Sequence, residues 1–231
     1  MKMTPPAVTG LGLLSALTDQ QILAYADPDD LDGDGISGVP NYVNPPDYFV
    51  PQWFHEEVNG RYIGRFGKKA AAIDLQQQTV TAYNQDMGIT STFEPVDPFS
   101  GLTVDPEVSD QTIRDVVFYL RTLKAPIQRS PENQQVIQGK ALFNQIQCGA
   151  CHIPEWTTPS SDIAAISNKT FYPYTDLLLH DMGAGLDDGV TEGSAETYEW
   201  RTPSLWGLGL SPDSQGGSYF LMHDGRAGSI E

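Results

Sequence analysis

The pentapeptide Cys148-Gly149-Ala150-Cys151-His152 holds both cysteines of this 231-residue chain and decides how the rest is interpreted. Two thiols three positions apart, followed at once by a histidine, form the attachment motif of a c-type haem. On one helical turn the two thiols reach the two vinyl groups of a porphyrin, and the histidine then faces the iron. The motif therefore predicts one covalently attached haem c on Cys148 and Cys151, with His152 as the proximal iron ligand.

Three other uses of a Cys-x-x-Cys pair remain open: a disulfide, a redox dithiol and half of a zinc site. A redox dithiol gives His152 no role and is expected between a strand and a helix. A zinc site needs two further nitrogen or sulfur ligands, and the chain has no second cysteine pair. The haem interpretation uses all three residues and is the one that the sequence favours.

Two helices are predicted ahead of the haem motif. The first covers residues 109–124, and its apolar face consists of Ile113, Val116, Val117, Leu120 and Leu123. The second is expected to begin with Ser130 as N-cap and Pro131 in the first turn, and to run to Ile146. Gly139 in its middle costs about 1 kcal/mol relative to Ala, which indicates that another element crosses close to it.

The predicted fold class is mainly α, a cytochrome c-like domain with loop-rich segments and an acidic calcium-type loop. Residues 105–231 are expected to form the c-type cytochrome domain, with short turns and strand pairs after residue 153. Residues 1–104 are expected to form a loop-rich region with short helices. A capping box at Thr18 and Gln21 predicts one of these helices, and residues 74–87 predict another.

The acidic loop at residues 27–38 reads Asp-Pro-Asp-Asp-Leu-Asp-Gly-Asp-Gly-Ile-Ser-Gly. Counted from its fourth residue, it places carboxylates at positions 1, 3 and 5 and a glycine at position 6, as at the start of an EF-hand calcium loop. With the backbone carbonyl at position 7, the candidate calcium ligands are Asp30, Asp32, Asp34 and Ile36. Position 12 is Asn41 instead of the bidentate Glu, so the site is either incomplete or closed by a distant ligand such as Glu56. A solvated acidic turn is the alternative, because Asp and Gly favour turns.

The charge of the chain argues against several classes of partner. It has 30 acidic and 13 basic residues, for a net charge of −17. A chain this acidic repels phosphate backbones and anionic lipid surfaces, so we expect no nucleic-acid partner. No stretch approaches the roughly 18 apolar residues that cross a bilayer, so we expect no membrane span. Glycine-rich phosphate loops, nucleophile elbows and His-Glu-x-x-His motifs are also missing from the sequence.

Segments along nearly the whole chain resemble those of the di-haem oxidoreductases, relatives of bacterial di-haem cytochrome c peroxidases and of the di-haem enzymes that mature methylamine dehydrogenase. Besides the acidic loop and the haem motif, the matching segments are residues 4–14, 64–67, 86–90, 176–183, 200–208 and 222–226. Members of this family carry two haem motifs. This chain carries one, which corresponds by the order of segments to the C-terminal haem. The resemblance therefore implies an internal fragment, with the first haem domain before Met1 and a further helix after Glu231.

In the related peroxidases the C-terminal haem passes electrons and the N-terminal haem reduces peroxide. The resemblance thus implies a c-type haem electron-transfer domain, part of a peroxidase-like oxidoreductase. Its partner is expected to be a redox protein or the missing N-terminal haem domain. The alternatives are a peroxidase acting at this haem and a calcium-binding structural module with a vestigial haem site. Covalent haem attachment takes place outside the cytoplasm in bacteria, which predicts a periplasmic or otherwise extracytoplasmic location, although no signal peptide is evident.

The sixth iron ligand is open between five side chains: Met182, Met87, His180, His223 and Met222. Met182 and His223 are the principal candidates, because a thioether suits electron transfer and a second imidazole suits transfer at lower potential. A ligand outside these residues, or an open position, is also consistent with the sequence. Arg201 and Arg226 are candidate partners for the haem propionates, since Arg forks fit carboxylates; hydrogen bonding to loop carbonyls is the alternative.

Overall fold

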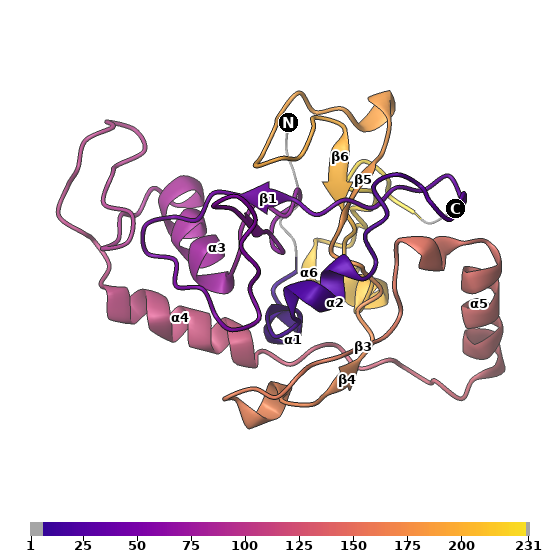
Figure 1. Cartoon of the computed structure of the whole chain (residues 1–231). Coiled ribbons are helices and arrows are strands. Elements are labelled where there is room, and N and C mark those ends of the chain that lie inside the picture. Colours follow the sequence, from indigo (N-terminus) through magenta and orange to yellow (C-terminus); the bar gives the residue numbers. More distant parts are fainter. Residues whose placement is uncertain (1–6, 230–231) are drawn as a thin grey trace.

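In the computed structural model, which describes residues 7–229, short helices and two-stranded sheets are joined by long loops (Figure 1). The chain is 28% helical and 13% strand. The prediction of a mainly α class is therefore wrong, because the architecture is mixed and loop-rich, and the cytochrome c-like fold is not confirmed. The physical reason lies in the 22 Gly and 17 Pro residues, which interrupt helices and favour turns.

Six α-helices are formed in the described part of the chain. They are α1 (Leu11–Ser15), α2 (Asp19–Leu23), α3 (Leu75–Thr81), α4 (Asp110–Thr122), α5 (Gln134–Gln145) and α6 (Ser211–Ser214). The predicted capping box of α2 is confirmed: Thr18 Oγ1 accepts from the Gln21 amide at 3.1 Å, and Gln21 Oε1 accepts from the Thr18 amide at 3.0 Å. The helix expected over residues 74–87 is also found, as α3 followed by a π-helical turn at Ala82–Asp86.

The two helices ahead of the haem motif agree with the sequence to different degrees. The first is confirmed as α4, whose N-cap Ser109 accepts from the Thr112 amide at 3.1 Å. The second, α5, begins later than predicted. Asn133 is its N-cap, with Oδ1 accepting from the Gln135 amide at 2.8 Å. Ser130 instead has a φ of 47°, in the left-handed region, so it belongs to a turn and cannot start the helix.

Three antiparallel two-stranded sheets complete the fold. They pair β1 (Tyr42–Val43) with β2 (Tyr62–Ile63), β3 (Trp156–Thr157) with β4 (Thr170–Phe171), and β5 (Leu179–Asp181) with β6 (Glu199–Arg201). The last two pairs confirm the strand pairs expected after residue 153. In the third sheet His180 lies opposite Trp200. A bridge between Val39 and Leu179 joins the end of the acidic loop region to β5.

The main hydrophobic core is assembled from distant parts of the chain. It consists of Leu11, Leu14, Leu17, Ile22, Ile63, Phe66, Ala72, Leu75, Trp156, Phe171, Leu177 and Leu178. α1 packs on α4 so closely that a side chain at Gly12 would overlap the carbonyl of Arg121. Because this core draws on residues from both sides of residue 104, the two predicted regions share it, and their division stays a prediction.

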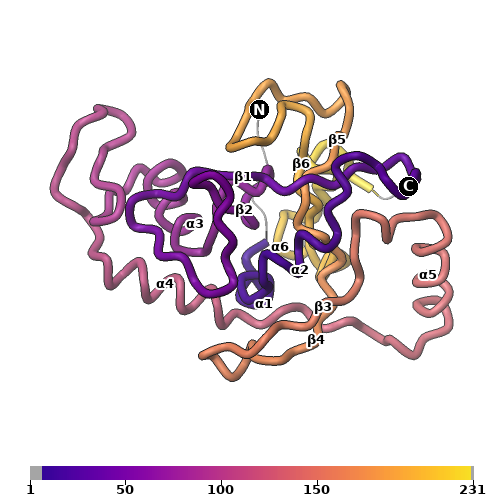
Figure 2. Tube along the Cα trace, in the orientation of Figure 1, coloured from indigo at the N-terminus to yellow at the C-terminus, as the bar shows by residue number. Residues whose placement is uncertain are grey.

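α5 lies at one side of the molecule, away from α3 and α4 (Figure 2). None of its residues is buried, and Ile137, Leu142 and Ile146 at its end are about half exposed or more. The expected crossing at Gly139 is not formed within the described residues, because no atom lies within 4 Å of the position where its Cβ would be.

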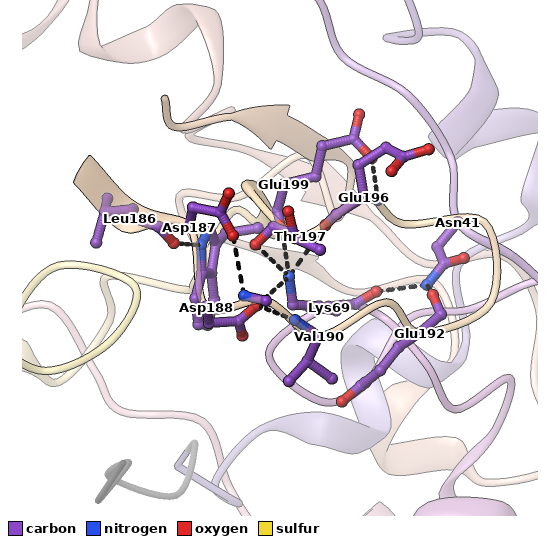
Figure 3. A network of polar contacts seen from close by, with 12 residues as sticks. Asn41, Lys69, Leu186, Asp187, Asp188, Val190, Glu192, Glu196, Thr197 and Glu199 are labelled. Atoms are coloured by element: carbon purple, nitrogen blue, oxygen red, sulfur yellow. Dashed lines mark hydrogen bonds and ion pairs between the residues drawn. The ribbon is translucent and has the colours of Figure 1, made fainter. Parts of the chain in front are cut away.

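Lys69 fastens the loop between β5 and β6 to the N-terminal half of the chain. Its buried ammonium donates to the carbonyls of Glu196, Thr197 and Glu199 at 3.0, 3.0 and 3.1 Å, and pairs with Asp188 at 3.1 Å (Figure 3). A buried charge is tolerated only with such a full set of partners. These contacts hold the start of β6 and the residues just before it in place.

None of the helices at residues 7–229 has the length and apolar character needed to cross a membrane.

Candidate haem site

The haem motif follows α5 through a single left-handed residue. Gln147 has a φ of 63° and turns the chain into a 3₁₀ turn at Cys148–Ala150. The amide of His152 donates to the carbonyl of Cys148 at 3.0 Å, which closes the turn. Both cysteines are free thiols and partly exposed. The two thiols and the imidazole are thus presented by one compact turn.

His152 is held by the backbone of a second segment. Its Nδ1 donates to the carbonyl of Tyr174 at 2.7 Å. Burial lowers the pKa of His152, and the Tyr174 carbonyl opposes this lowering. The ring of Phe143 on α5 stands edge-on to both His152 and Tyr174, with centroid separations of 6.4 and 5.4 Å. The proton that Nδ1 donates to the Tyr174 carbonyl leaves the lone pair of the neutral ring on Nε2, the form that ligates a metal.

His180 and Asp176 lie against the motif, a relationship that the sequence did not indicate. His180 Nδ1 is 3.5 Å from Cys151 Sγ, and His180 Nε2 donates to Asp176 Oδ2 at 2.7 Å. Burial lowers the pKa of His180, but the hydrogen bonds to Asp176 and Cys151 outweigh it and raise this pKa to about 10. The spacing of Asp176 and His180 was visible in the sequence, but only the loop path brings the pair to Cys151.

These residues fit a covalently held haem. The donor set provides two free thiols next to one imidazole whose outer nitrogen is already satisfied by a carbonyl. Ligating histidines characteristically make such a hydrogen bond through the nitrogen that does not bind the metal. The exposed apolar residues of α5 and the large aromatic ring of Phe143 provide contact surface for a flat macrocycle on the same helix.

The candidate sixth ligands are scattered over the structure. Both ring nitrogens of His180 already have partners, so it has none left for an iron. His223 Nδ1 lies 3.2 Å from the carbonyl of Arg201, and burial lowers its pKa to about 4, so the ring is neutral. Met182 follows β5 and is partly buried, whereas Met87 and Met222 are 54% and 49% exposed. Met182 and His223 stay predictions as sixth ligands.

The two candidate propionate arginines bind backbone in the structure. Arg201 is buried and donates to the carbonyls of Gly67 and Thr202 at 2.8 and 3.0 Å. Arg226 pairs with Asp224 and donates to the carbonyl of Gly185 at 2.6 Å. Their assignment to haem propionates stays a prediction.

The acidic loop gathers a different set of carboxylates from the one predicted. Oxygens of Asp27, Asp30 and Asp32 all lie within 4.8 Å of one another. Asp27 is the residue that sequence reasoning missed, since it precedes position 1 of the EF-hand register. Asp34 turns to its own backbone and accepts from the Ile36 amide at 2.8 Å.

The residues considered for closing this loop lie elsewhere. Asn41 is buried and donates to the carbonyls of Lys69 and Glu192 at 2.6 and 2.8 Å. The amide of Glu56 is bonded to Asp19 at 2.7 Å. The calcium ligands Asp30, Asp32, Asp34 and Ile36 therefore stay predictions, and the structure groups Asp27 with the first two.

Comparison with known proteins identifies one family. The family described as "Di-haem oxidoreductase, putative peroxidase" matches residues 2–231 of the chain. Among the curated proteins and the solved structures, no match is found. Because the family match covers almost the entire sequence and agrees with the haem motif, the chain belongs to the di-haem oxidoreductase family.

Proposed function

We propose that this chain is the electron-transfer domain of a di-haem oxidoreductase, carrying one haem c covalently on Cys148 and Cys151, with His152 as proximal ligand. The observation that carries the proposal is the 2.7 Å hydrogen bond from His152 Nδ1 to the carbonyl of Tyr174, next to two free thiols. When bound, the haem supplies a one-electron iron couple. The chain's own residues orient the imidazole and hold the attachment turn at the end of α5.

The proposal extends to the partner and the location of the protein. The family name implies two haems, whereas the sequence has a single Cys-x-x-Cys-His. We therefore propose that the electrons are exchanged with a redox protein or with a second haem domain. Covalent haem attachment supports an extracytoplasmic, periplasmic location.

An absorption spectrum tests the central claim. The full chain is produced in a host that attaches c-type haem, and the oxidised and reduced spectra are compared with haem staining after denaturing electrophoresis. Wild type is expected to retain haem under denaturing conditions and to be reduced reversibly. A double variant, Cys148→Ala with Cys151→Ala, should lose the covalent haem. If wild type shows no covalent haem, the proposal fails.

Peroxide reduction at this haem is the second candidate, and the family description favours it. The two candidates differ in the sixth coordination position. Electron transfer alone predicts a six-coordinate, low-spin iron with no turnover of peroxide. Peroxidase activity predicts a five-coordinate, high-spin ferric iron that oxidises an electron donor in the presence of peroxide, and low-spin spectra without turnover would contradict it.

We also propose calcium as a second cofactor, bound at the acidic loop. The support is the gathering of the Asp27, Asp30 and Asp32 carboxylates, because calcium takes several oxygen ligands from one loop. This proposal is independent of the haem and is tested separately below.

A further inference from the structure

A cavity of about 90 Å³ is lined mainly by residues of α1 and of the segments at residues 65–68 and 201–206, and basic side chains outnumber acidic ones in its lining. Its lining includes Arg65, Lys68, Arg201 and His223 and, among residues 7–229, no carboxylate. The whole chain has 13 basic against 30 acidic residues. Three basic side chains around one small cavity, without an acidic one, therefore run against the composition of the molecule and need a physical reason.

The position of the cavity relative to His152 follows from the residues that line it. Pro203 and His223 are both among the lining residues. A hydrogen bond to Pro203 acts on the pKa of His152, and the charge of His152 acts on His223. The cavity is thus within electrostatic range of the proposed iron ligand.

Lys68 has no partner for its charge within the described part of the chain. No hydrogen bond or ion pair involves its ammonium, although the side chain is only partly exposed. Asp224 is the acidic group that acts on it, but that carboxylate is already paired with Arg226. Lys68 differs in this respect from its neighbour Lys69, whose ammonium has four oxygen partners.

Arg201 is buried with only neutral hydrogen-bond acceptors. Its guanidinium donates to the carbonyls of Gly67 and Thr202. Asp176 acts on it from a distance, yet the carboxylate of Asp176 is bonded to His180 at 2.7 Å. Burial lowers the pKa of Arg201 to about 10 as a result. The cavity is therefore lined by two cations, Lys68 and Arg201, whose charges no carboxylate of residues 7–229 neutralises.

Two further atoms of the lining residues lack a partner within residues 7–229. They are the Nε donor of Arg65, a residue that is 1% exposed, and the Oε1 acceptor of Gln78. The rest of the Arg65 guanidinium is satisfied, because it pairs with the buried Asp19. Buried donors and acceptors normally have hydrogen-bond partners, so both atoms indicate that polar groups from bound molecules occupy the cavity.

Water alone would satisfy the two polar atoms but would leave the two charges uncompensated, which is costly in a partly buried site. A carboxylate compensates the two charges and accepts from the Arg65 Nε donor, since Arg and Lys bind carboxylates through charge-assisted hydrogen bonds, while a water molecule satisfies the Gln78 acceptor. From the cavity's size and charge we infer that it binds a carboxylate group, held by Lys68 and Arg201.

The carboxylate has two possible sources with the same chemistry. It is either a propionate of the haem, in which case the inference rests on the proposed function, or a small free carboxylate such as acetate. Three forms of the haem-loaded full-length chain are compared to distinguish these sources: wild type, Lys68→Gln and the control variant Lys169→Gln. Lys169 is exposed and does not line the cavity. The reduction midpoint potential and the melting temperature are measured in acetate and in chloride at equal ionic strength.

A propionate predicts a lower midpoint potential for Lys68→Gln than for Lys169→Gln, because a cation at a propionate stabilises the reduced haem. It also predicts no specific effect of acetate. A free carboxylate predicts a saturable rise in melting temperature with acetate, absent in Lys68→Gln and retained in Lys169→Gln. The inference is wrong if the two variants behave alike in both measurements. If Lys68→Gln does not fold, Lys68→Met replaces it, and a potential and an acetate response equal to those of Lys169→Gln would contradict the inference. The c-type spectrum of each variant reports on the proposed function separately.

Discussion

The imidazole of His180 is held by the carboxylate of Asp176 at 2.7 Å and in turn lies 3.5 Å from Cys151 Sγ. This contact connects the haem motif to β5 through side chains alone. Since both nitrogens of His180 are engaged, the residue serves as a support for the attachment turn rather than as an iron ligand. The contact also makes the haem site sensitive to residues that are remote from it in sequence.

Replacing Asp176 by Asn is expected to lower the free energy of unfolding by about 1.5–3 kcal/mol, the range for a hydrogen bond to a charged group. The control is Asp181→Asn, at an exposed carboxylate next to His180. It should cost less than about 0.5 kcal/mol, as surface substitutions do. Urea unfolding at pH 7 checks both values, and equal losses would show that the Asp176–His180 contact has no special role.

The pH dependence of stability should have two limbs with different origins. The pKa of His180 is raised from 6.5 to about 10 in the folded chain, so its contribution is complete below pH 6.5 and is lost as the pH rises through 10. Burial lowers the pKa of His55 and of His223 from 6.5 to about 4. Protonation of these two residues therefore favours the unfolded chain, and the protein loses stability as the pH falls from 6.5 towards 4.

Urea unfolding between pH 4 and pH 10 measures these limbs. Asp176→Asn should flatten the alkaline limb and leave the acid limb in place. An alkaline limb that is unchanged in this variant would assign the effect to another group.

Lys69→Met should destabilise the protein by about 3–5 kcal/mol, because it leaves Asp188 buried without its charge partner. The matched control is the adjacent Lys68→Met, which removes an ammonium with no hydrogen bond or ion pair within residues 7–229 and should cost far less. Hydrogen exchange of the segment at residues 187–199 should rise selectively in Lys69→Met. Similar losses of unfolding free energy in both variants would show that the four oxygen contacts of the Lys69 ammonium do not order this loop.

The ion pair between Arg65 and Asp19 is buried on both sides, with 1% and 0% exposure, whereas that between Arg114 and Asp110 is more than half exposed. Arg65→Met is expected to cost about 3–5 kcal/mol, since it strands a buried carboxylate. Arg114→Met is expected to cost less than about 0.5 kcal/mol. Chemical denaturation measures the difference, and comparable values would mean that Asp19 is neutralised by other groups.

Calcium should raise the melting temperature of the chain, and a chelator should lower it again. Asp30→Asn should weaken the effect strongly, because its carboxylate belongs to the cluster with Asp27 and Asp32. Asp29→Asn is the control, as an exposed carboxylate of the same loop outside the cluster. A melting temperature that changes neither with calcium nor with the chelator would contradict the proposed calcium site.

Features that depend on neighbouring residues were determined by the sequence alone. The capping box at Thr18 and the helix α4 depend on side chains three or four positions apart, and both are confirmed. The pentapeptide at Cys148 and the ordered segments along the chain likewise led to the family, because such motifs are local in sequence. The start of α5 was predicted wrongly at Ser130, because Asn133 is the N-cap and Ser130 lies in a turn.

Features that join distant residues were decided only by the tertiary structure. The carbonyl of Tyr174 that orients His152, the contact of His180 with Cys151, and the cations of the cavity all bring together segments that are far apart in the sequence, and their positions depend on the packed core. The mainly α expectation failed for the same reason. Helical periodicity is read over a few turns, whereas glycine- and proline-rich loops take their course from long-range burial and from buried charges such as Lys69.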